Sequence, residues 1–343
     1  MVLTKDIKAS TNIVILFALI FLLSGDVGFA QNQSFSTLWH ISDDGKELTC
    51  QSSMGKCGNI DILELERFPE LEVLNFGRNQ VSNIPLLEKF PHLKELYITL
   101  DSDNISFLRS LHALKIINIS SSKKIKDIAV LGNLSSLEEV WLANTSVTDI
   151  SILSKLQQLR VLVISNTPIK DISILSNFLN LERLDISSTN IDDLSVLAKL
   201  TKLKNLCFYE TQVSDISALA GLNELQYLNF RNTLVDNISP IHGLKNLEEL
   251  YISNLKKVVD ISFLANNLNL SRLYINGTQV KDISPLKNLD KLLYLNLAGT
   301  PISDITPLFG HTSLVEIYLM NTNIPNEQIA RLKSESPETH VEK

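Results

Sequence analysis

The sequence lacks the residues and motifs on which most enzymes depend. It has 6 histidines, 3 cysteines and 12 glycines in 343 residues. No histidine stands in a recognisable pair with a nucleophile. A glycine-rich phosphate loop, an HExxH metal motif and a nucleophile elbow are all missing. We therefore expect a protein that is not an enzyme and that uses no cofactor.

A strong charge of one sign is also missing. The chain has 31 Lys and Arg against 38 Asp and Glu, a net charge of −7. The charge is spread along the chain and the basic residues form no stripe, which argues against nucleic acid as a partner.

Only one long apolar run is present, and it is short for a membrane span. Lys5 and Lys8 precede the run, which covers residues 13–23, and small residues ending at Ala30 follow it. This order predicts a secretory signal peptide over residues 1–30. The alternative is an uncleaved N-terminal anchor. We expect export to the periplasm, the cell surface or the medium, with no membrane insertion once the signal is removed.

The rest of the chain is dominated by a 22-residue repeat. About twelve copies begin at Leu71, Leu93, Leu114, Leu137, Leu159, Leu181, Leu203, Leu225, Leu247, Leu270, Leu292 and Leu314. In each copy, apolar residues take places 1, 4, 6, 11, 14, 17 and 20. This period is typical of a leucine-rich repeat solenoid.

One copy shows how the coil is expected to run. Residues 161–165 alternate like a half-buried strand, and residues 171–175 begin a tight helical turn on the opposite side. A single coil cannot bury seven apolar residues, so the coils must stack. We predict an α/β repeat fold over residues 71–324, with a parallel concave sheet and short 3-10 or helical turns on the convex side.

Both ends of a solenoid need a cap, because the terminal coils would otherwise expose their apolar faces. Residues 31–70 are the expected N-terminal cap and residues 325–343 the C-terminal one. Apolar residues available to the first cap are Trp39, Leu48, Ile60, Ile62, Leu65 and Phe68. Cys50 and Cys57 lie close together in a chain predicted to be exported, which favours a disulfide. The alternative, a metal site, has only His40 nearby as a further ligand.

Two polar columns recur in the repeats. Threonine takes the ninth place in most copies, where a hydroxyl can satisfy backbone groups of stacked coils. Aspartate precedes the fourteenth place, which suits a cap on the amides of the helical turn. The alternative function for the aspartates is a row of calcium sites, one in each coil. One carboxylate and a serine per coil cannot supply six to eight oxygens, so we expect no metal site.

These units resemble the internalin-type repeat of bacteria, a class that includes phosphatase-regulator repeats. The likeness rests on the 171–175 motif DISIL and on its Ser-Pro variants at Ser239, Ser284 and, as Thr-Pro, at Thr306. It covers about three quarters of the chain, although threonine stands where internalins usually carry asparagine. The resemblance implies a curved, non-catalytic scaffold whose concave sheet binds another protein.

The outward places 3, 5 and 7 of the coil are the candidate binding surface. All 7 tyrosines of the chain fall there, whereas phenylalanines take inward places. None of the six histidines is expected on the strand surface. Tyrosine and arginine with few lysines are typical of a protein interface. The candidate partner-binding residues are Tyr97, Trp141, Arg183, Tyr209, Tyr227, Arg231, Tyr251, Arg272, Tyr274, Tyr294 and Tyr318.

Three functions remain open from the sequence. The favoured one is a monomeric exported scaffold that holds a protein or peptide on its concave face. A carbohydrate-binding protein is the second, because tyrosine and tryptophan also stack on sugars. The third is a structural component of the envelope. Cys207, the third cysteine, falls at an outward place, where it is either reactive or simply a small residue between larger ones.

Overall fold

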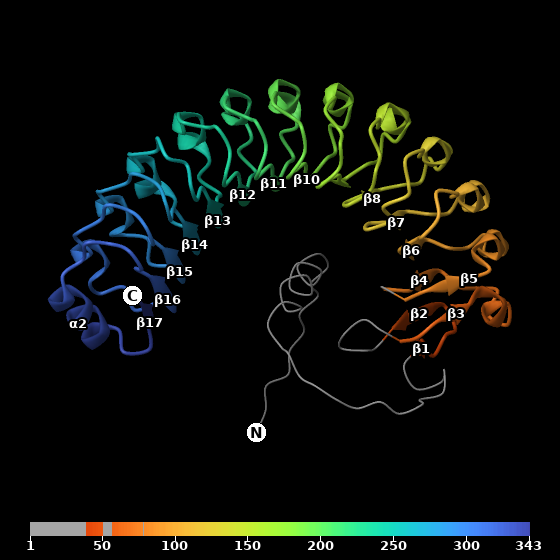
Figure 1. Cartoon of the computed structure of the whole chain (residues 1–343), viewed down its shortest axis with the longest axis horizontal. Coiled ribbons are helices and arrows are strands. Elements are labelled where there is room, and N and C mark those ends of the chain that lie inside the picture. The colour runs from red at the N-terminus through yellow and green to blue at the C-terminus, as the bar shows by residue number, and fades with distance from the viewer. Residues whose placement is uncertain (1–38, 51–56, 78) are drawn as a thin grey trace.

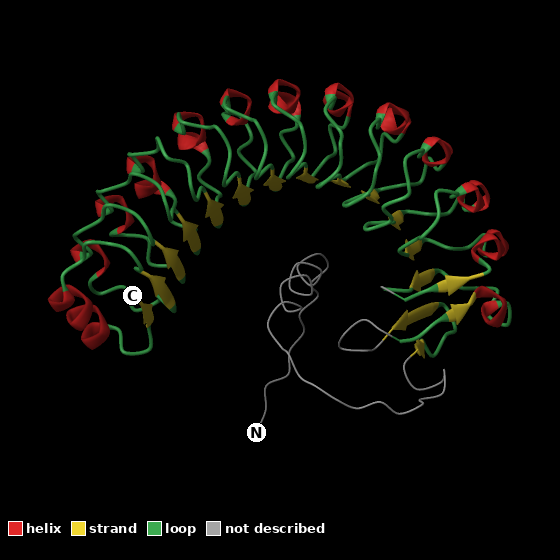
Figure 2. Cartoon of the chain, viewed as in Figure 1, coloured by secondary structure: helices red, strands yellow, loops and turns green. Residues whose placement is uncertain are grey.

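The computed structural model describes residues 39–50, 57–77 and 79–343. Over these residues the chain forms an arc of stacked coils, with strands lining the inner side and short helices the outer side (Figures 1 and 2). The expected signal peptide, residues 1–30, and the first part of the expected cap lie outside the described residues. No helix among the described residues is both long enough and apolar enough to cross a bilayer.

The inner layer is a 15-stranded sheet in which neighbouring coils contribute neighbouring strands. β1 (Trp39–Ile41) runs antiparallel to β2 (Glu47–Cys50), and all later pairs are parallel. The repeat strands have three residues each. The strand expected over residues 161–165 is therefore shorter, since its pairing ends at Val163. The repeat strands are β4 (Val73–Asn75), β6 (Glu95–Tyr97), β7 (Ile116–Asn118), β8 (Glu139–Trp141), β9 (Val161–Val163), β10 (Arg183–Asp185), β11 (Asn205–Cys207), β12 (Tyr227–Asn229), β13 (Glu249–Tyr251), β14 (Arg272–Tyr274), β15 (Tyr294–Asn296) and β16 (Glu316–Tyr318). The last strand of the sheet, β17 (His340–Glu342), follows the repeats.

The outer layer consists of one short 3-10 helix per coil, as the repeat pattern predicts. A small second sheet pairs β3 (Ile60–Asp61) with β5 (Val81–Ser82) at the N-terminal end. The helices are η2 (Ile62–Leu65), η3 (Ile84–Lys89), η4 (Ser106–Ser110), η5 (Ala129–Asn133), η6 (Ser151–Lys155), η7 (Ser173–Asn177), η8 (Ser195–Lys199), η9 (Ser217–Leu219), η10 (Ser239–Gly243), η11 (Ser262–Asn266), η12 (Ser284–Leu286) and η13 (Thr306–Leu308). The leucine-rich repeat solenoid is therefore confirmed.

The core runs between the two layers as one continuous apolar column. The repeat leucines and isoleucines at inward places are buried, and so are the phenylalanines that the pattern assigns there. Phe208 and Phe230, from consecutive coils, stack with ring centres 5.3 Å apart. Because each coil buries its apolar side against its neighbours, each coil is stabilised by the coils on either side of it.

The aspartate column caps the helical turns, as predicted. In coil after coil a carboxylate oxygen accepts the amide hydrogen of the residue two positions on, for example Asp171 from Ser173 at 2.8 Å and Asp193 from Ser195 at 2.7 Å. The aspartate stands one residue before the helix cap itself, which is Ile172 in the first case. Hydrogen bonds from the backbone amides lower the pKa of Asp171 and of Asp193.

The threonine column differs from the expectation in its partner. The hydroxyl of Thr167 donates to the carbonyl of Ile164 at 2.6 Å, and Thr278 donates to Ile275 at 2.7 Å. These bonds lie within one coil, not between stacked coils, because the chain turns back toward the ninth residue immediately after the strand. The column therefore closes each turn and does not form a ladder along the arc.

A third column, at the eighth place, was missed from the sequence. Its residues have left-handed backbone conformations, with φ of 52° at Asn166 and 70° at Gly277. Asparagine and glycine tolerate this region better than other residues, and their recurrence at one place was the available signal. In two places, asparagine side chains of adjacent coils also form a hydrogen bond with one another. Asn166 donates to Asn144 at 2.5 Å, and Asn254 donates to Asn232.

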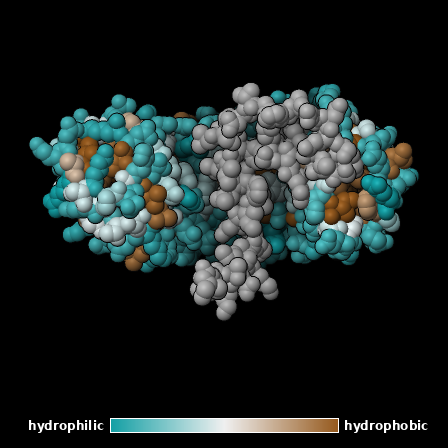
Figure 3. Space-filling model, turned by 90° about the horizontal axis from the view of Figure 1, so that it is seen from below, coloured by the Kyte–Doolittle hydropathy of each residue, from teal (hydrophilic) through white to brown (hydrophobic). Residues whose placement is uncertain are grey.

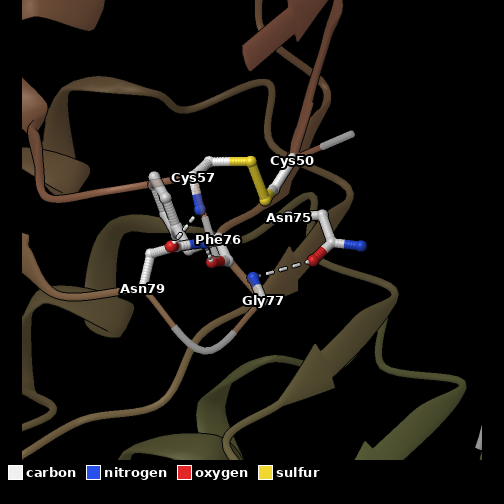
Figure 4. The surroundings of a disulfide bond; sticks show 6 residues. All are labelled: Cys50, Cys57, Asn75, Phe76, Gly77 and Asn79. Atoms are coloured by element: carbon white, nitrogen blue, oxygen red, sulfur yellow. Dashed lines mark hydrogen bonds between the residues drawn. A yellow bond between two sulfur atoms is a disulfide. The ribbon is translucent and has the colours of Figure 1, made fainter. Parts of the chain in front are cut away.

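The N-terminal end is closed by the expected apolar residues together with a disulfide. Trp39, Leu48, Ile60, Ile62 and Leu65 are buried, and Phe68 packs partly buried against them. Cys50 and Cys57 are joined by a disulfide, and Asn79 links this loop to the first repeat coil (Figure 4). The Asn79 side chain accepts from the amide of Cys57 at 2.5 Å and donates to the carbonyl of Phe76 at 2.6 Å.

The C-terminal end contains the expected helix and one strand that the sequence did not predict. Helix α2 (Asn326–Glu335) covers the last coil, and β17 then extends the sheet beside β16. The expectation that no histidine lies on the strand surface is therefore wrong for His340, which pairs in register with Glu316. Viewed from the open side of the arc, hydrophobic residues are visible at both ends (Figure 3).

Candidate partner-binding face

Each repeat strand presents two side chains to the inside of the arc. The middle residue of a strand is buried in the core, and the residues on either side are half-buried in most strands. Parallel pairing keeps equivalent places in register, so these side chains form rows across the sheet. The concave face is defined here by the first and third residues of the strands of the 15-stranded sheet from β2 to β17, together with the seventh place of each coil. β3 and β5, which form the small second sheet, are not part of it.

All seven tyrosines lie on the concave face, and none is packed into the core. Six are strand residues, and Tyr209 lies two residues past the end of β11. Trp141 is the third residue of β8. Arg183 and Arg272 are first residues of β10 and β14, and Arg231 follows β12 by two residues.

The tyrosines of β12, β13 and β14 form a contiguous stack. The ring centres of Tyr227 and Tyr251 are 5.3 Å apart, and those of Tyr251 and Tyr274 are 4.7 Å apart with 13° between the ring planes. Tyr251 and Tyr274 are therefore stacked, whereas Tyr227 packs against Tyr251 with its ring plane tilted by 37°. Burial raises the pKa of each of these three phenols, so they stay neutral and able to donate hydrogen bonds at physiological pH.

Glu249 organises the middle of this stack. One of its oxygens accepts from the Tyr251 hydroxyl at 2.7 Å, and the other pairs with Arg272 Nη1 at 2.7 Å. The same Arg272 guanidinium lies 4.7 Å from the centre of the Tyr294 ring. A carboxylate, a guanidinium and two phenols are thus fixed in one layer across β13, β14 and β15.

Two further arginines lie over aromatic rings on this face. Arg231 lies 4.1 Å from the centre of Tyr209, and Arg183 lies 5.0 Å from the centre of Trp141. Val161 and Val163 of β9, which the sequence places at outward positions, are only 7% and 4% exposed. They lie between the strands that carry Arg183 and Trp141, so the larger side chains cover them.

A pairing of glutamate and aromatic residues recurs on four strands and was missed from the sequence. Each has glutamate first and Tyr or Trp third: Glu95 and Tyr97, Glu139 and Trp141, Glu249 and Tyr251, Glu316 and Tyr318. Tyr97 donates to Glu95 at 2.9 Å, and the Trp141 indole donates to Glu139 at 3.2 Å. A hydrogen bond to Glu316 raises the pKa of Tyr318 to about 12. The Glu-x-aromatic spacing was the available signal, because residues two apart share a face of a strand.

Glu139 is a partly buried carboxylate whose neighbours act on its pKa in opposite directions. Burial raises its pKa, while the Trp141 hydrogen bond and the charges of Arg160 and Arg183 act in the opposite direction. Its ionised form is therefore partly desolvated and depends on those neighbours.

Carboxylates outnumber arginines on the concave face. Among the described residues three arginines face inward, at Arg183, Arg231 and Arg272, together with His340. The carboxylates there are Glu47, Glu95, Glu139, Asp185, Glu249, Glu316 and Glu342. The face therefore has a negative balance and several fixed positive positions.

Cys207 lies on this face between Asp185 and Asn229 of the neighbouring strands. Its thiol is not in a disulfide, and burial, with the nearby Asp185 charge, raises its pKa. A thiol with a raised pKa is a weak nucleophile, which favours the interpretation of Cys207 as a small packing residue.

The surface hollows lie away from the tyrosines. Within the described ranges, no three His, Cys, Asp or Glu side chains converge as metal ligands. Surface hollows lie along the second and third repeat coils, near Asp103, Lys123 and Asp127, where acidic and basic side chains are both present.

Comparisons with known proteins agree with this fold. The family model described as Leucine Rich repeats (2 copies) matches residues 69–109, 135–177, 179–221, 223–266 and 268–310. A search among curated proteins finds no significant relative. An internalin of Listeria monocytogenes, InlF, is 26% identical over 87% of this chain and 84% of its own, with a TM-score of 0.72.

Two more distant structures share the fold alone. A leucine-rich repeat protein of Leptospira interrogans is 16% identical, over 86% of this chain and 93% of its own, with a TM-score of 0.69. The ectodomain of the Arabidopsis thaliana receptor kinase GASSHO1/SCHENGEN3, in complex with CASPARIAN STRIP INTEGRITY FACTOR 2, is 19% identical, over 77% and 34%, with a TM-score of 0.61. The repeat periodicity, the parallel inner sheet and the matched family model together show that this chain belongs to the leucine-rich repeat family.

Proposed function

We propose that this protein is an exported, non-catalytic scaffold of the internalin type that holds a segment of another protein on its concave face. The single observation that carries the proposal is the run of half-buried tyrosines from β12 to β16, with Arg272 fixed between them. Tyrosine and arginine bury a large area with little loss of side-chain freedom, which is why they dominate protein interfaces. The protein acts as a monomer in this proposal.

The stacking of the tyrosines favours a protein partner over a sugar. A sugar ring binds to an aromatic side chain through the open face of the ring. Tyr251 has the Tyr227 ring 5.3 Å away, tilted by 37°, and the Tyr274 ring stacked 4.7 Å away, so neighbouring rings already occupy part of its faces. Its hydroxyl donates to Glu249, so this side chain offers a polypeptide partly exposed ring surface and a hydroxyl oxygen that can accept a hydrogen bond.

Export is supported by the composition of residues 1–30 and by the Cys50–Cys57 disulfide. Disulfides persist in oxidising compartments and are rare in the cytosol. At the level of the fold, the Arabidopsis ectodomain solved in complex with CASPARIAN STRIP INTEGRITY FACTOR 2 is an example of a leucine-rich repeat array that carries a bound partner.

The test is a pull-down from envelope and host-cell extracts with wild-type protein and a Tyr251→Ala, Tyr274→Ala, Tyr294→Ala variant. We expect the wild type to retain a specific protein that the variant loses. The matched control is Leu63→Ala, Leu179→Ala, Leu234→Ala, which removes exposed apolar side chains outside the concave face, each 55–58% exposed. Equal retention by all three proteins would contradict the proposal. Binding on a glycan array that the tyrosine variant loses would favour the carbohydrate function instead.

A further inference from the structure

The four pairs of glutamate and aromatic residues on the concave face differ in whether a positive charge accompanies them. At the Glu249 and Tyr251 pair, Arg272 Nη1 lies 2.7 Å from the carboxylate. At the Glu139 and Trp141 pair, the Arg183 guanidinium lies 5.0 Å from the indole centre and its charge acts on Glu139. Two of the four pairs are thus filled by arginines of the chain itself.

The other two pairs have no such arginine. Glu95 of β6 lies between Val73 and Ile116 of the adjacent strands, and it accepts a hydrogen bond from Tyr97. Glu316 of β16 lies between Tyr294 and His340. Within the part of the chain that the structure describes, neither Glu95 nor Glu316 forms an ion pair. All four of these glutamates are half-buried, so the open pairs offer partly desolvated carboxylates to an incoming ligand.

We propose that the Glu95–Tyr97 and Glu316–Tyr318 pairs each bind an arginine or lysine side chain of the partner, so that the partner of the concave face is a basic protein segment. This inference rests on the proposed function and specifies its partner. The filled pairs supply the precedent, because they show which kind of group the same arrangement accepts within this molecule.

The physical basis is the combination of two attractions at one place. A carboxylate already held by a phenol hydrogen bond is oriented before the ligand arrives, and a charged donor bonds it more strongly than a neutral one. The aromatic ring beside it adds the attraction between a cation and a ring face. The excess of carboxylates on the concave face draws a basic segment toward it over a longer range.

The distance between the two pairs without an arginine, Glu95–Tyr97 and Glu316–Tyr318, determines how long a partner must be to contact both. They lie on β6 and β16, ten strand steps apart, and at ~4.8 Å a step this is about 48 Å along the sheet. A short peptide therefore binds each pair separately, whereas one partner that contacts both must follow the arc.

The experiment uses a fluorescein-labelled hexa-arginine peptide and a Gly-Ser peptide of equal length, with anisotropy measured at low ionic strength. We expect the wild type to bind hexa-arginine at least tenfold more tightly than the Gly-Ser peptide. A Glu95→Gln, Glu316→Gln variant keeps the size of both side chains and an oxygen for each tyrosine, and it should weaken binding about tenfold or more. The control Glu88→Gln, Glu224→Gln makes the same change of charge at exposed sites elsewhere and should change affinity less than about twofold.

A second variant distinguishes the contribution of the aromatic rings from that of the carboxylate charges. Tyr97→Leu, Tyr318→Leu keeps both carboxylates but removes the rings, and it should still weaken hexa-arginine binding about threefold. Equal losses in the two glutamine variants, or no loss in the leucine variant, would overturn the assignment, as would wild-type binding of hexa-arginine no tighter than of the Gly-Ser peptide. If the partner found by pull-down needs the stacked tyrosines but not Glu95 and Glu316, the binding face stands and the basic partner does not.

Discussion

The guanidinium carbon of Arg183 lies 5.0 Å from the centre of the Trp141 ring, although an entire strand, β9, separates the two residues. The two side chains cover the valines of β9, which explains why these valines are buried although most side chains on this face are half-buried. The contact also ties three consecutive coils together on the concave side, where the sheet alone would connect only neighbours.

We predict a measurable coupling between Arg183 and Trp141. In a double-mutant cycle with Arg183→Met and Trp141→Leu, urea denaturation should give a coupling free energy of about 0.5–1 kcal/mol. Methionine retains the length of the stem without the charge, so the cycle isolates the interaction with the ring. A coupling no greater than that between Arg183 and the distant Tyr318 would contradict it.

The disulfide should stabilise the N-terminal cap more than the rest of the array. Replacing Cys50 and Cys57 by serine should cost about 2 kcal/mol, because a short loop of the unfolded chain is no longer closed. In a stack of coils the loss should first appear as fraying at that end, which amide hydrogen exchange detects. Reductant should lower the denaturation midpoint of the wild type and of Cys207→Ser, and leave the Cys50→Ser, Cys57→Ser variant unchanged.

The repeat explains why so much of the fold could be predicted. Each inward leucine or isoleucine recurs at a fixed place, so a dozen copies average out the local ambiguity that limits a single strand or helix. The aspartate caps could be predicted for the same reason, since a carboxylate two residues before a free amide depends only on local geometry. The tyrosines follow from alternation along the strand, which places them opposite the buried residues.

The features that could not be predicted depend on the end of the array or on long side chains. β17 lies outside the repeat period, so its pairing with β16 follows from where helix α2 ends and not from any pattern. The threonine bonds were assigned to the wrong coil because the sequence does not reveal how sharply the chain turns after the strand. Arg183 crosses β9 to reach Trp141 through a long, flexible side chain. The spacing of residues in the sequence does not reveal which conformation such a side chain adopts.

The aspartate caps should make stability fall in acid. Amide hydrogen bonds lower the pKa of Asp171, Asp193 and Asp304 in the folded state. A lowered folded-state pKa means that the stabilisation is complete above the unfolded value of about 3.9 and is lost as pH falls below it through the folded pKa. The urea midpoint of the wild type should therefore drop steeply below about pH 4.

A variant with these three aspartates replaced by asparagine should show a smaller drop over the same range. Asparagine keeps an oxygen that can accept the amide hydrogen but has no charge to lose. The control replaces Asp43, Asp103 and Asp290, exposed carboxylates that cap no helical turn, and should follow the wild-type curve. Identical curves for the two triple variants would rule out the caps as the source of the acid sensitivity.

The stacked phenylalanines should be the most sensitive point of the core. Phe208 is fully buried and its ring packs 5.3 Å from that of Phe230 in the next coil. Phe208→Ala leaves a cavity and should cost about 3–5 kcal/mol. Because coils depend on their neighbours, a loss of this size at the centre should divide the array into two parts that unfold at different urea concentrations. Leu234→Ala, at a site 58% exposed, should change stability by less than about 0.5 kcal/mol. A single sharp transition in Phe208→Ala, at the wild-type midpoint, would show that the core does not depend on this stack.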